Sequence, residues 1–264
     1  MCIICEGKNI EGLKDLICFG CPTITNIPVI DGLTKLFCYG CPFLTSIPNI
    51  DKLEVLNCSS CPLLTSIPNI NGLKKLDCSG CRDLTSVPNI TGLKVLNCSR
   101  CLNIQSIPNI IGLEELYCSR CPDMTTIPDI NGLKKLYCSE SLRLTSIPNI
   151  TGLKELYCFN CPFLTSIPTM TFLEELFCSD CPLLINIPMT GILHCYNCPW
   201  IPKSPDNKIM LGLKLQSWIR KNYRYFVFQR WIKSQEGREF LYDPKRIGGR
   251  IEILRMKKAL EGLN

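Results

Sequence analysis

Cysteine is the residue type with the widest range of possible chemistry in this chain. The sequence holds 21 cysteines and a single histidine, His194. Nine pairs follow the pattern C-x-x-C between Cys18 and Cys198. That spacing is typical of zinc sites and of dithiol redox centres. Three roles are therefore open for the cysteines: they could bind metal ions, form disulfides, or pack in the core as reduced thiols.

The spacing of the pairs favours burial. Most of the pairs recur every twenty residues, and in one further unit, which begins its pair with Cys138, Ser141 replaces the second cysteine. A four-ligand metal site tolerates that replacement poorly, whereas a small polar group that bonds turn backbone tolerates it well. Disulfides between adjacent strands also fit poorly, because parallel strands lie ~4.8 Å apart while disulfide Cβ atoms prefer ~3.8 Å. We therefore expect unreactive reduced thiols, no metal ion and no cofactor.

Other catalytic arrangements are not recognisable. The sequence has no Gly-rich phosphate loop and no H-E-x-x-H motif, and a Ser-His-Asp triad would depend on His194 alone. We expect His194 to be an ordinary surface residue and the protein not to be an enzyme.

The elements that must position the cysteines form a repeat. The unit L-x-x-L-x-C-x-x-C-P-x-L-T-S-I-P-N-I-x-G runs nine times over residues 13–192, a shortened tenth unit ends near Pro199, and residues 1–12 hold a partial one. Alternate residues of L-x-x-L-x-C face opposite ways, as in a strand, and the regular prolines exclude a helix from the return limb. One unit cannot bury its own leucines. The sequence therefore predicts a solenoid of short parallel strands with extended or turn-like return limbs over residues 13–202.

This pattern resembles the leucine-rich-repeat family, whose strand signature is L-x-x-L-x-L-x-x-N/C-x-L, over residues 13–199. The short unit looks most like the repeats of bacterial effector proteins, although cysteine here takes both strand-end positions. The resemblance implies that the outward strand residues line a concave face that binds ligands. Such effectors often append a ubiquitin-ligase domain with a catalytic cysteine, but no cysteine follows Cys198. We therefore expect a non-catalytic scaffold for protein–protein interaction.

The outward column, between the second leucine and the first cysteine of each unit, reads Ile17, Phe37, Asn57, Asp77, Asn97, Tyr117, Tyr137, Tyr157, Phe177 and His194. Aromatic residues are typical binding anchors, although they also favour strands in their own right. We take as candidate partner-binding residues Phe37, Tyr117, Tyr137, Tyr157 and Phe177, with a charged rim of Glu115, Lys135, Glu155 and Glu175. The polar stretch Asn57–Asn97 is expected to contribute less.

Residues 203–264 differ from the repeats in charge. They carry 15 Lys and Arg against 6 Asp and Glu, whereas residues 1–202 carry 14 against 17. Leu211, Leu215, Trp218 and Ile219 share one helical face, which predicts a basic helical region that caps the last coil. Two alternatives stay open: a surface for nucleic acid or an acidic partner, and a helix that lies on a membrane surface.

The segment 240–250 resembles a C-terminal motif of cysteine-rich leucine-repeat proteins from giant amoeba viruses of the mimivirus kind. That resemblance implies a viral protein with a host protein as its partner. Two alternatives are a substrate-recognition adaptor for a host ubiquitin ligase and a structural virion protein. No run approaches the ~18 apolar residues of a membrane helix, and the N-terminus lacks the features of a secretory signal. We therefore expect an intracellular location, in the host cytoplasm.

Overall fold

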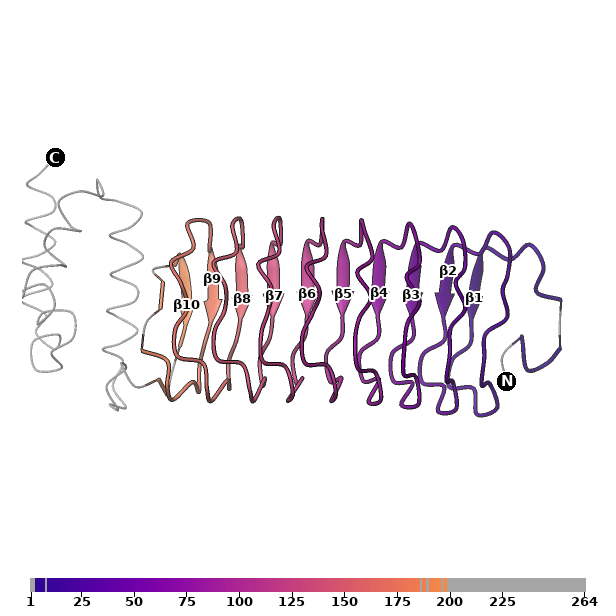
Figure 1. Cartoon of the computed structure of the whole chain (residues 1–264), viewed down its shortest axis with the longest axis horizontal. Coiled ribbons are helices and arrows are strands. Elements are labelled where there is room, and N and C mark those ends of the chain that lie inside the picture. Colours follow the sequence, from indigo (N-terminus) through magenta and orange to yellow (C-terminus); the bar gives the residue numbers. More distant parts are fainter. Residues whose placement is uncertain (1–2, 8, 186, 189, 196, 199–264) are drawn as a thin grey trace, which may run out of the picture. The chain divides into compact units, whose positions relative to one another are not determined.

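The computed structural model describes residues 3–7, 9–185, 187–188, 190–195 and 197–198. Its repeats wind into stacked coils, each contributing one three-residue strand (Figure 1). The strands are β1 (Asp15–Ile17), β2 (Lys35–Phe37), β3 (Val55–Asn57), β4 (Lys75–Asp77), β5 (Val95–Asn97), β6 (Glu115–Tyr117), β7 (Lys135–Tyr137), β8 (Glu155–Tyr157), β9 (Glu175–Phe177) and β10 (Ile192–His194).

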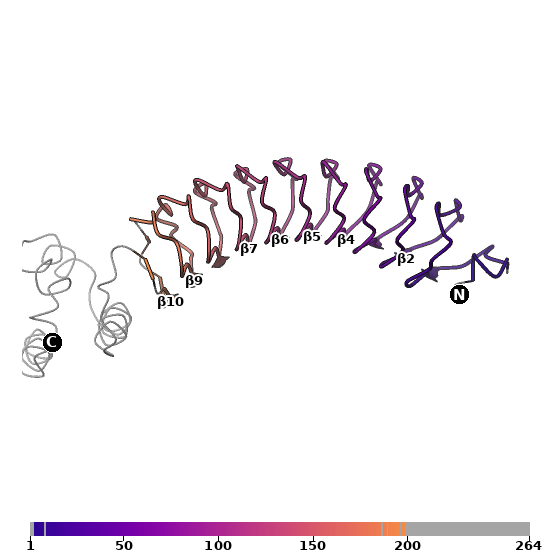
Figure 2. The same ribbon diagram turned by 90° about the horizontal axis from the view of Figure 1, so that it is seen from below.

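The ten strands form one sheet in chain order. Strands β1 to β9 pair in parallel with an offset of twenty residues, so Leu16 lies beside Leu36 and Leu136 beside Leu156. The amide of Cys178 continues the hydrogen bonding to the carbonyl of His194, at 3.0 Å. The coils follow a curve with the strands on its inner side (Figure 2). The predicted leucine-rich solenoid is therefore confirmed, and its outward strand residues lie on the concave face.

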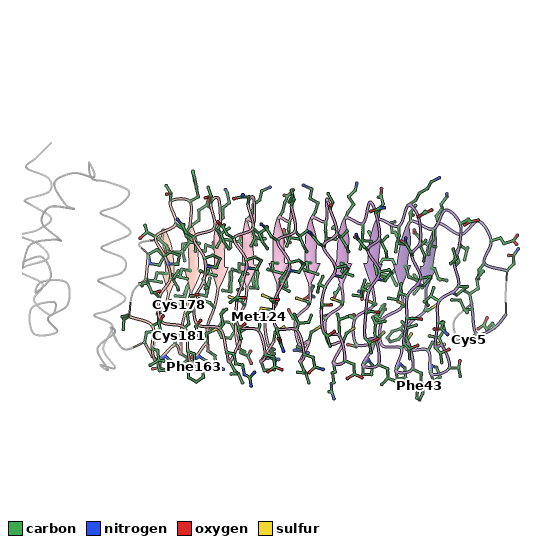
Figure 3. All side chains as sticks on the ribbon, in the orientation of Figure 1. Cys5, Phe43, Met124, Phe163, Cys178 and Cys181 are labelled. Carbon is green, nitrogen blue, oxygen red and sulfur yellow. The ribbon has the colours of Figure 1, made fainter. Side chains whose placement is uncertain are left out.

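The core is built from equivalent side chains of successive coils (Figure 3). Seven apolar positions of the coil that contains β2 have at most 6% of their surface exposed: Leu33, Leu36, Cys38, Cys41, Leu44, Ile47 and Ile50. Burial of one such leucine contributes about 2 kcal/mol of transfer free energy. Each coil covers the apolar side of the next, which is why the unit must repeat.

The turns around each strand depend on left-handed backbone. The predicted glycine turn before the strand is present, with φ of 76° at Gly32 and 88° at Gly72. A second left-handed residue follows the first cysteine by two positions, and it is often not glycine, as at Ser60 (φ 56°) and Arg100 (φ 61°). The amide of Arg100 donates to the carbonyl of Ser119 in the next coil at 2.8 Å. That hydrogen bond helps to offset the 1–2 kcal/mol that left-handed backbone costs a residue with a Cβ.

The predicted C-terminal region, residues 203–264 with its helical cap, lies outside the described residues. Within the described ranges, no helix has the length and apolar character needed to cross a membrane.

Candidate partner-binding face

The aromatic residues of the concave face form one continuous stack. Ring centroids are 4.7 Å apart between Tyr117 and Tyr137, and 4.3 Å apart both between Tyr137 and Tyr157 and between Tyr157 and Phe177. The angles between ring planes are 22°, 9° and 9°. The strand register explains the stack, because it places each ring directly beside the ring of the next coil.

His194 of β10 extends this stack, with its ring 4.2 Å from that of Phe177 and tilted by 13°. The sequence predicts an ordinary surface residue at His194, and its stacking on Phe177 was not predicted. Its place in the outward column was the available signal, since an imidazole is planar and can continue a stack. We call Tyr117, Tyr137, Tyr157, Phe177 and His194 the aromatic ladder.

Stacking changes how much of each ring is exposed. The sequence predicts a row of exposed aromatics. In the structure Tyr117, Tyr137, Tyr157 and Phe177 are half-buried and so less exposed than predicted, because each covers a face of its neighbour. Coplanar rings would overlap at centroid distances of 4.2–4.7 Å, so the rings must face one another along the array. Their edges and hydroxyl groups are what the ladder presents to a partner.

The carboxylates of the predicted rim are hydrogen-bonded to the ladder. The hydroxyl of Tyr117 donates to Glu115 at 2.9 Å, and the hydroxyl of Tyr137 donates to Glu155 at 3.1 Å. Glu155 also pairs with Lys135 of the preceding strand, with nitrogen and oxygen 3.0 Å apart. The rim is therefore partly self-paired, and these contacts hold the rings in position.

Glu175 lies at the C-terminal end of this rim. It accepts a longer hydrogen bond, of 3.5 Å, from the hydroxyl of Tyr157. Burial raises the pKa of the Tyr137 hydroxyl well above its ordinary value, and the hydrogen bond to Glu155 raises it further. For Tyr157, burial raises the pKa first and the charge of Glu175 second. The tyrosines therefore stay protonated donors to these carboxylates at neutral pH.

A second set of charged residues lies one position before the rim residues in the sequence. Most of them form ion pairs with the equivalent residue of an adjacent coil. Glu114 binds Lys134 at 2.6 Å and Lys94 at 2.9 Å, and Lys154 binds Glu174 at 2.9 Å. These pairs are exposed and span equivalent positions. They stabilise the stacking of coils only weakly, because water screens exposed ion pairs.

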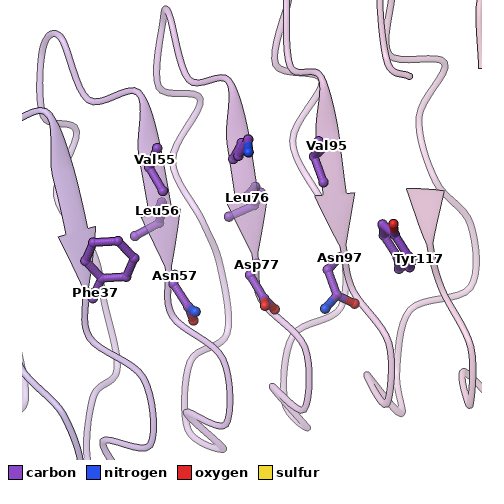
Figure 4. A pocket seen from close by; sticks show the side chains of 10 residues that line it. Phe37, Val55, Leu56, Asn57, Leu76, Asp77, Val95, Asn97 and Tyr117 are labelled. Atoms are coloured by element: carbon purple, nitrogen blue, oxygen red, sulfur yellow. The ribbon is translucent and has the colours of Figure 1, made fainter. Parts of the chain in front are cut away.

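Phe37 lies apart from the aromatic ladder. It stands at one end of a hollow of about 280 Å³ on the concave face, and Tyr117 stands at the other (Figure 4). The column residues between them, Asn57, Asp77 and Asn97, have short side chains and leave the space open. Val55, Lys75 and Val95 line the hollow beside them. The structure therefore divides the predicted site into a ladder and a hollow.

Comparison with known proteins agrees with this architecture. The Leucine Rich Repeat family model matches residues 52–71, which is the length of one unit. The leucine-rich-repeat domain of the type III effector XCV3220 (XopL) matches with a TM-score of 0.60 and 21% identity, over 71% of this chain and 78% of that one. The chain has the leucine-rich-repeat fold, and one of its units matches the family model. At this identity the likeness establishes the fold, and leucine-rich-repeat folds commonly serve as scaffolds for protein binding.

A second leucine-rich-repeat protein, from Bacteroides ovatus ATCC 8483, matches at 16% identity with a TM-score of 0.34, over 68% of this chain and 75% of that one. No curated protein sequence matches the chain. The resemblance to giant amoeba virus proteins therefore stays a prediction.

The second cysteine of each coil occupies the Asn/Cys position of the leucine-rich-repeat signature. The thiol of Cys41 donates to the carbonyl of Cys18 at 3.0 Å, and that of Cys181 to Cys158 at 3.2 Å. The same bond recurs in the coils between them, except where Ser141 stands. This confirms the predicted backbone-bonding role of the second cysteine.

The first cysteine of each coil packs in the core, where Cys118, Cys138 and Cys158 have no exposed surface. Burial raises the pKa of all three thiols well above the ordinary value. Since the thiolate is both the nucleophile and the metal ligand, these groups are held in their unreactive form. Among the described residues, no group of three or more histidine, cysteine or acidic side chains is placed to hold a metal ion.

Proposed function

We propose that this protein is a non-catalytic scaffold that binds a protein partner through its concave face, with the aromatic ladder as the principal contact. The observation that supports this most is the unbroken stack of five rings at 4.2–4.7 Å. Rings held by their neighbours lose little conformational freedom on binding, which lowers the entropic cost of association. Tyrosine is also enriched among residues that dominate binding energy.

The carboxylates around the ladder support a protein ligand. Glu115 and Glu175 accept hydrogen bonds from tyrosines, and neither has an ion pair with a lysine or arginine in the described part of the chain. An apolar centre with polar groups at its edge is the usual arrangement of a protein interface. We further propose that the partner is a host protein and that binding takes place inside the cell. The buried reduced thiols suit a reducing compartment.

The test is affinity capture from host lysate with the full-length protein, followed by measurement of dissociation constants for the captured partner. We expect Tyr137→Ala and Tyr157→Ala each to weaken binding by about 2 kcal/mol, which is about thirtyfold. Asn57→Ala should cost less than about 1 kcal/mol. Phe163→Ala is a matched control, because Phe163 is an exposed aromatic residue outside the strands.

Folding must be checked in each variant. A stacked ring contributes about 0.5–1.5 kcal/mol beyond its burial, so both tyrosine variants will melt somewhat lower than the parent protein. Binding is therefore measured well below the melting transition, which circular dichroism defines. A partner that binds both tyrosine variants as well as it binds the Phe163 control would show that the ladder serves the sheet alone.

A further inference from the structure

The aromatic ladder ends at Tyr117 with one ring face uncovered. Tyr137 covers the other face, at 4.7 Å between centroids. In the next coil toward the N-terminus the register places Asn97 beside Tyr117, and asparagine has no ring to continue the stack. The uncovered face of Tyr117 therefore forms one wall of the hollow that runs past Asn97 and Asp77 to Phe37 (Figure 4).

The polar side chains of the hollow leave defined groups for a ligand. One side-chain oxygen of Asn57, Asp77 and Asn97 accepts from the backbone amide two residues later, at 3.0, 3.0 and 3.1 Å. Because the amide oxygens of both asparagines are engaged, their free ends are NH2 donors, which can pair with carbonyl oxygens of a partner's backbone but not with a cationic group. Asp77 keeps its second carboxylate oxygen for other partners, and it makes no ion pair within the described residues.

We propose that this hollow receives an arginine side chain of the protein partner, an inference that rests on the proposed function. The guanidinium would lie at the level of Asn97, stacked on the uncovered face of Tyr117 and hydrogen-bonded to the free oxygen of Asp77. Adjacent strands are ~4.8 Å apart, so a group at that level is within the ~6 Å reach of a cation–π contact with Tyr117 and one strand from Asp77.

Arginine fits this geometry better than other planar or charged groups. The guanidinium is flat, stacks on aromatic faces and presents several donors to a carboxylate. A phenyl ring or an uncharged base could stack on Tyr117 but would cover Asp77 without pairing its charge. A lysine ammonium could pair with Asp77 but cannot stack as a plane.

Lys75 also lines the hollow, and its positive charge allows a cationic ligand to be distinguished from an anionic one. Its side chain is exposed and makes no ion pair in the described part of the chain. A guanidinium in the hollow is repelled by this ammonium and attracted by Asp77. Removal of each charge should therefore change affinity in opposite directions, and an anionic ligand would reverse both changes.

The experiment is selection of random heptapeptides displayed on phage against the immobilised full-length protein, followed by binding measurements on the selected peptides. We expect arginine to be enriched several-fold over the library. For arginine peptides, Asp77→Asn should weaken binding about tenfold, as expected for loss of a hydrogen bond between charged groups. Lys75→Gln should strengthen binding. Tyr117→Leu should weaken it about threefold, whereas Tyr117→Phe, which keeps the ring face, should not.

Several outcomes overturn the inference: selected peptides without arginine enrichment, acidic or aromatic enrichment instead, no selected peptides, or arginine peptides that bind Asp77→Asn as well as the parent protein. The first two leave the proposed function standing if binding of the selected peptides still falls with Tyr157→Ala. Failure of the proposed function shows separately, as a lysate partner that is insensitive to the tyrosine variants. Circular dichroism confirms that each variant folds.

Discussion

Ser141 occupies the position that holds the second cysteine in the neighbouring coils. Its hydroxyl is buried and has no hydrogen-bond partner within the described part of the chain, and the same is true of Ser139. The thiols of Cys121 and Cys161 reach carbonyls of the preceding coil at 3.2 and 3.4 Å. A C–O bond is shorter than a C–S bond, so the serine oxygen stops short of the equivalent carbonyl, that of Cys118.

We therefore expect Ser141→Cys to stabilise the protein. The new thiol should donate to the carbonyl of Cys118 and replace an unsatisfied buried hydroxyl, raising the free energy of unfolding by about 1 kcal/mol. Urea denaturation measures the change. Ser66→Cys, at an exposed position of another coil, is the control and should have little effect. A Ser141→Cys protein no more stable than the parent would mean that water already satisfies the hydroxyl.

At the scale of single residues, the sequence predicts most where the repeat constrains a position. The exchange of cysteine for serine at 141 argued for a backbone-bonding role. The thiol-to-carbonyl bonds confirm that role for the cysteines, whereas Ser141 itself makes no such bond within the described residues. The left-handed residues Ser60 and Arg100 could not be predicted in this way. Glycine is the usual signal for such backbone, and it is absent here, although these residues make the same bond to the next coil as Gly40 and Gly80 do in their coils.

At the scale of elements, the strand column acts as a unit. The twenty-residue offset determined which side chains align, so the line from Tyr117 to Phe177 was predictable. The face-to-face packing of the rings and the hollow beside Tyr117 were not. Both depend on side-chain shape: rings of similar size cover one another, and the short Asn57, Asp77 and Asn97 leave space. From the sequence alone, those polar residues are predicted only to make weak contacts.

The ladder should titrate as a group at alkaline pH. Burial and the neighbouring carboxylates raise the pKa of Tyr117, Tyr137 and Tyr157, whereas an unfolded tyrosine ionises near pH ~10. The neutral hydroxyl is favoured in the folded state. Its contribution to stability is therefore complete below pH ~10 and is lost as the pH rises from there through the folded pKa values.

Ultraviolet absorbance of tyrosinate, recorded against pH, measures this titration. Melting temperatures recorded over the same range should fall above pH ~10. Glu155→Gln removes the carboxylate that accepts from Tyr137 and should lower the pKa of that tyrosine. Ladder tyrosines that titrate with the same midpoint as unfolded chains would show that their hydroxyls are open to water.

At the scale of the whole molecule, the array behaves as a one-dimensional stack. Strands neighbour one another only in chain order, so each coil is supported by the coil before and the coil after it. Internal coils have two such neighbours and the ends of the array have fewer. Stability in such proteins is a sum of local and nearest-neighbour contributions, and partial opening from the ends is therefore expected.

The cysteines provide a reporter of that opening in every coil. A buried thiol with a raised pKa reacts with an alkylating reagent only when its coil opens. We expect alkylation of the native protein, located by mass spectrometry, to be fastest near the ends of the described array, at Cys21 and Cys195. It should be slowest at central positions such as Cys98 and Cys118. Urea below the unfolding midpoint should move reactivity inward from both ends.

A core substitution tests how far one coil supports the others. Leu96 of β5 is fully buried, and Leu96→Ala should destabilise its coil by about 2–5 kcal/mol through loss of burial and formation of a cavity. If support passes only between neighbours, alkylation should accelerate strongly at Cys98 and Cys101, less at Cys78 and Cys121, and little at Cys181. Ile17→Ala, at a largely exposed residue of β1, is the control and should leave the central thiols protected. Equal acceleration at every cysteine would contradict the nearest-neighbour account, because the array would then open as a single cooperative unit.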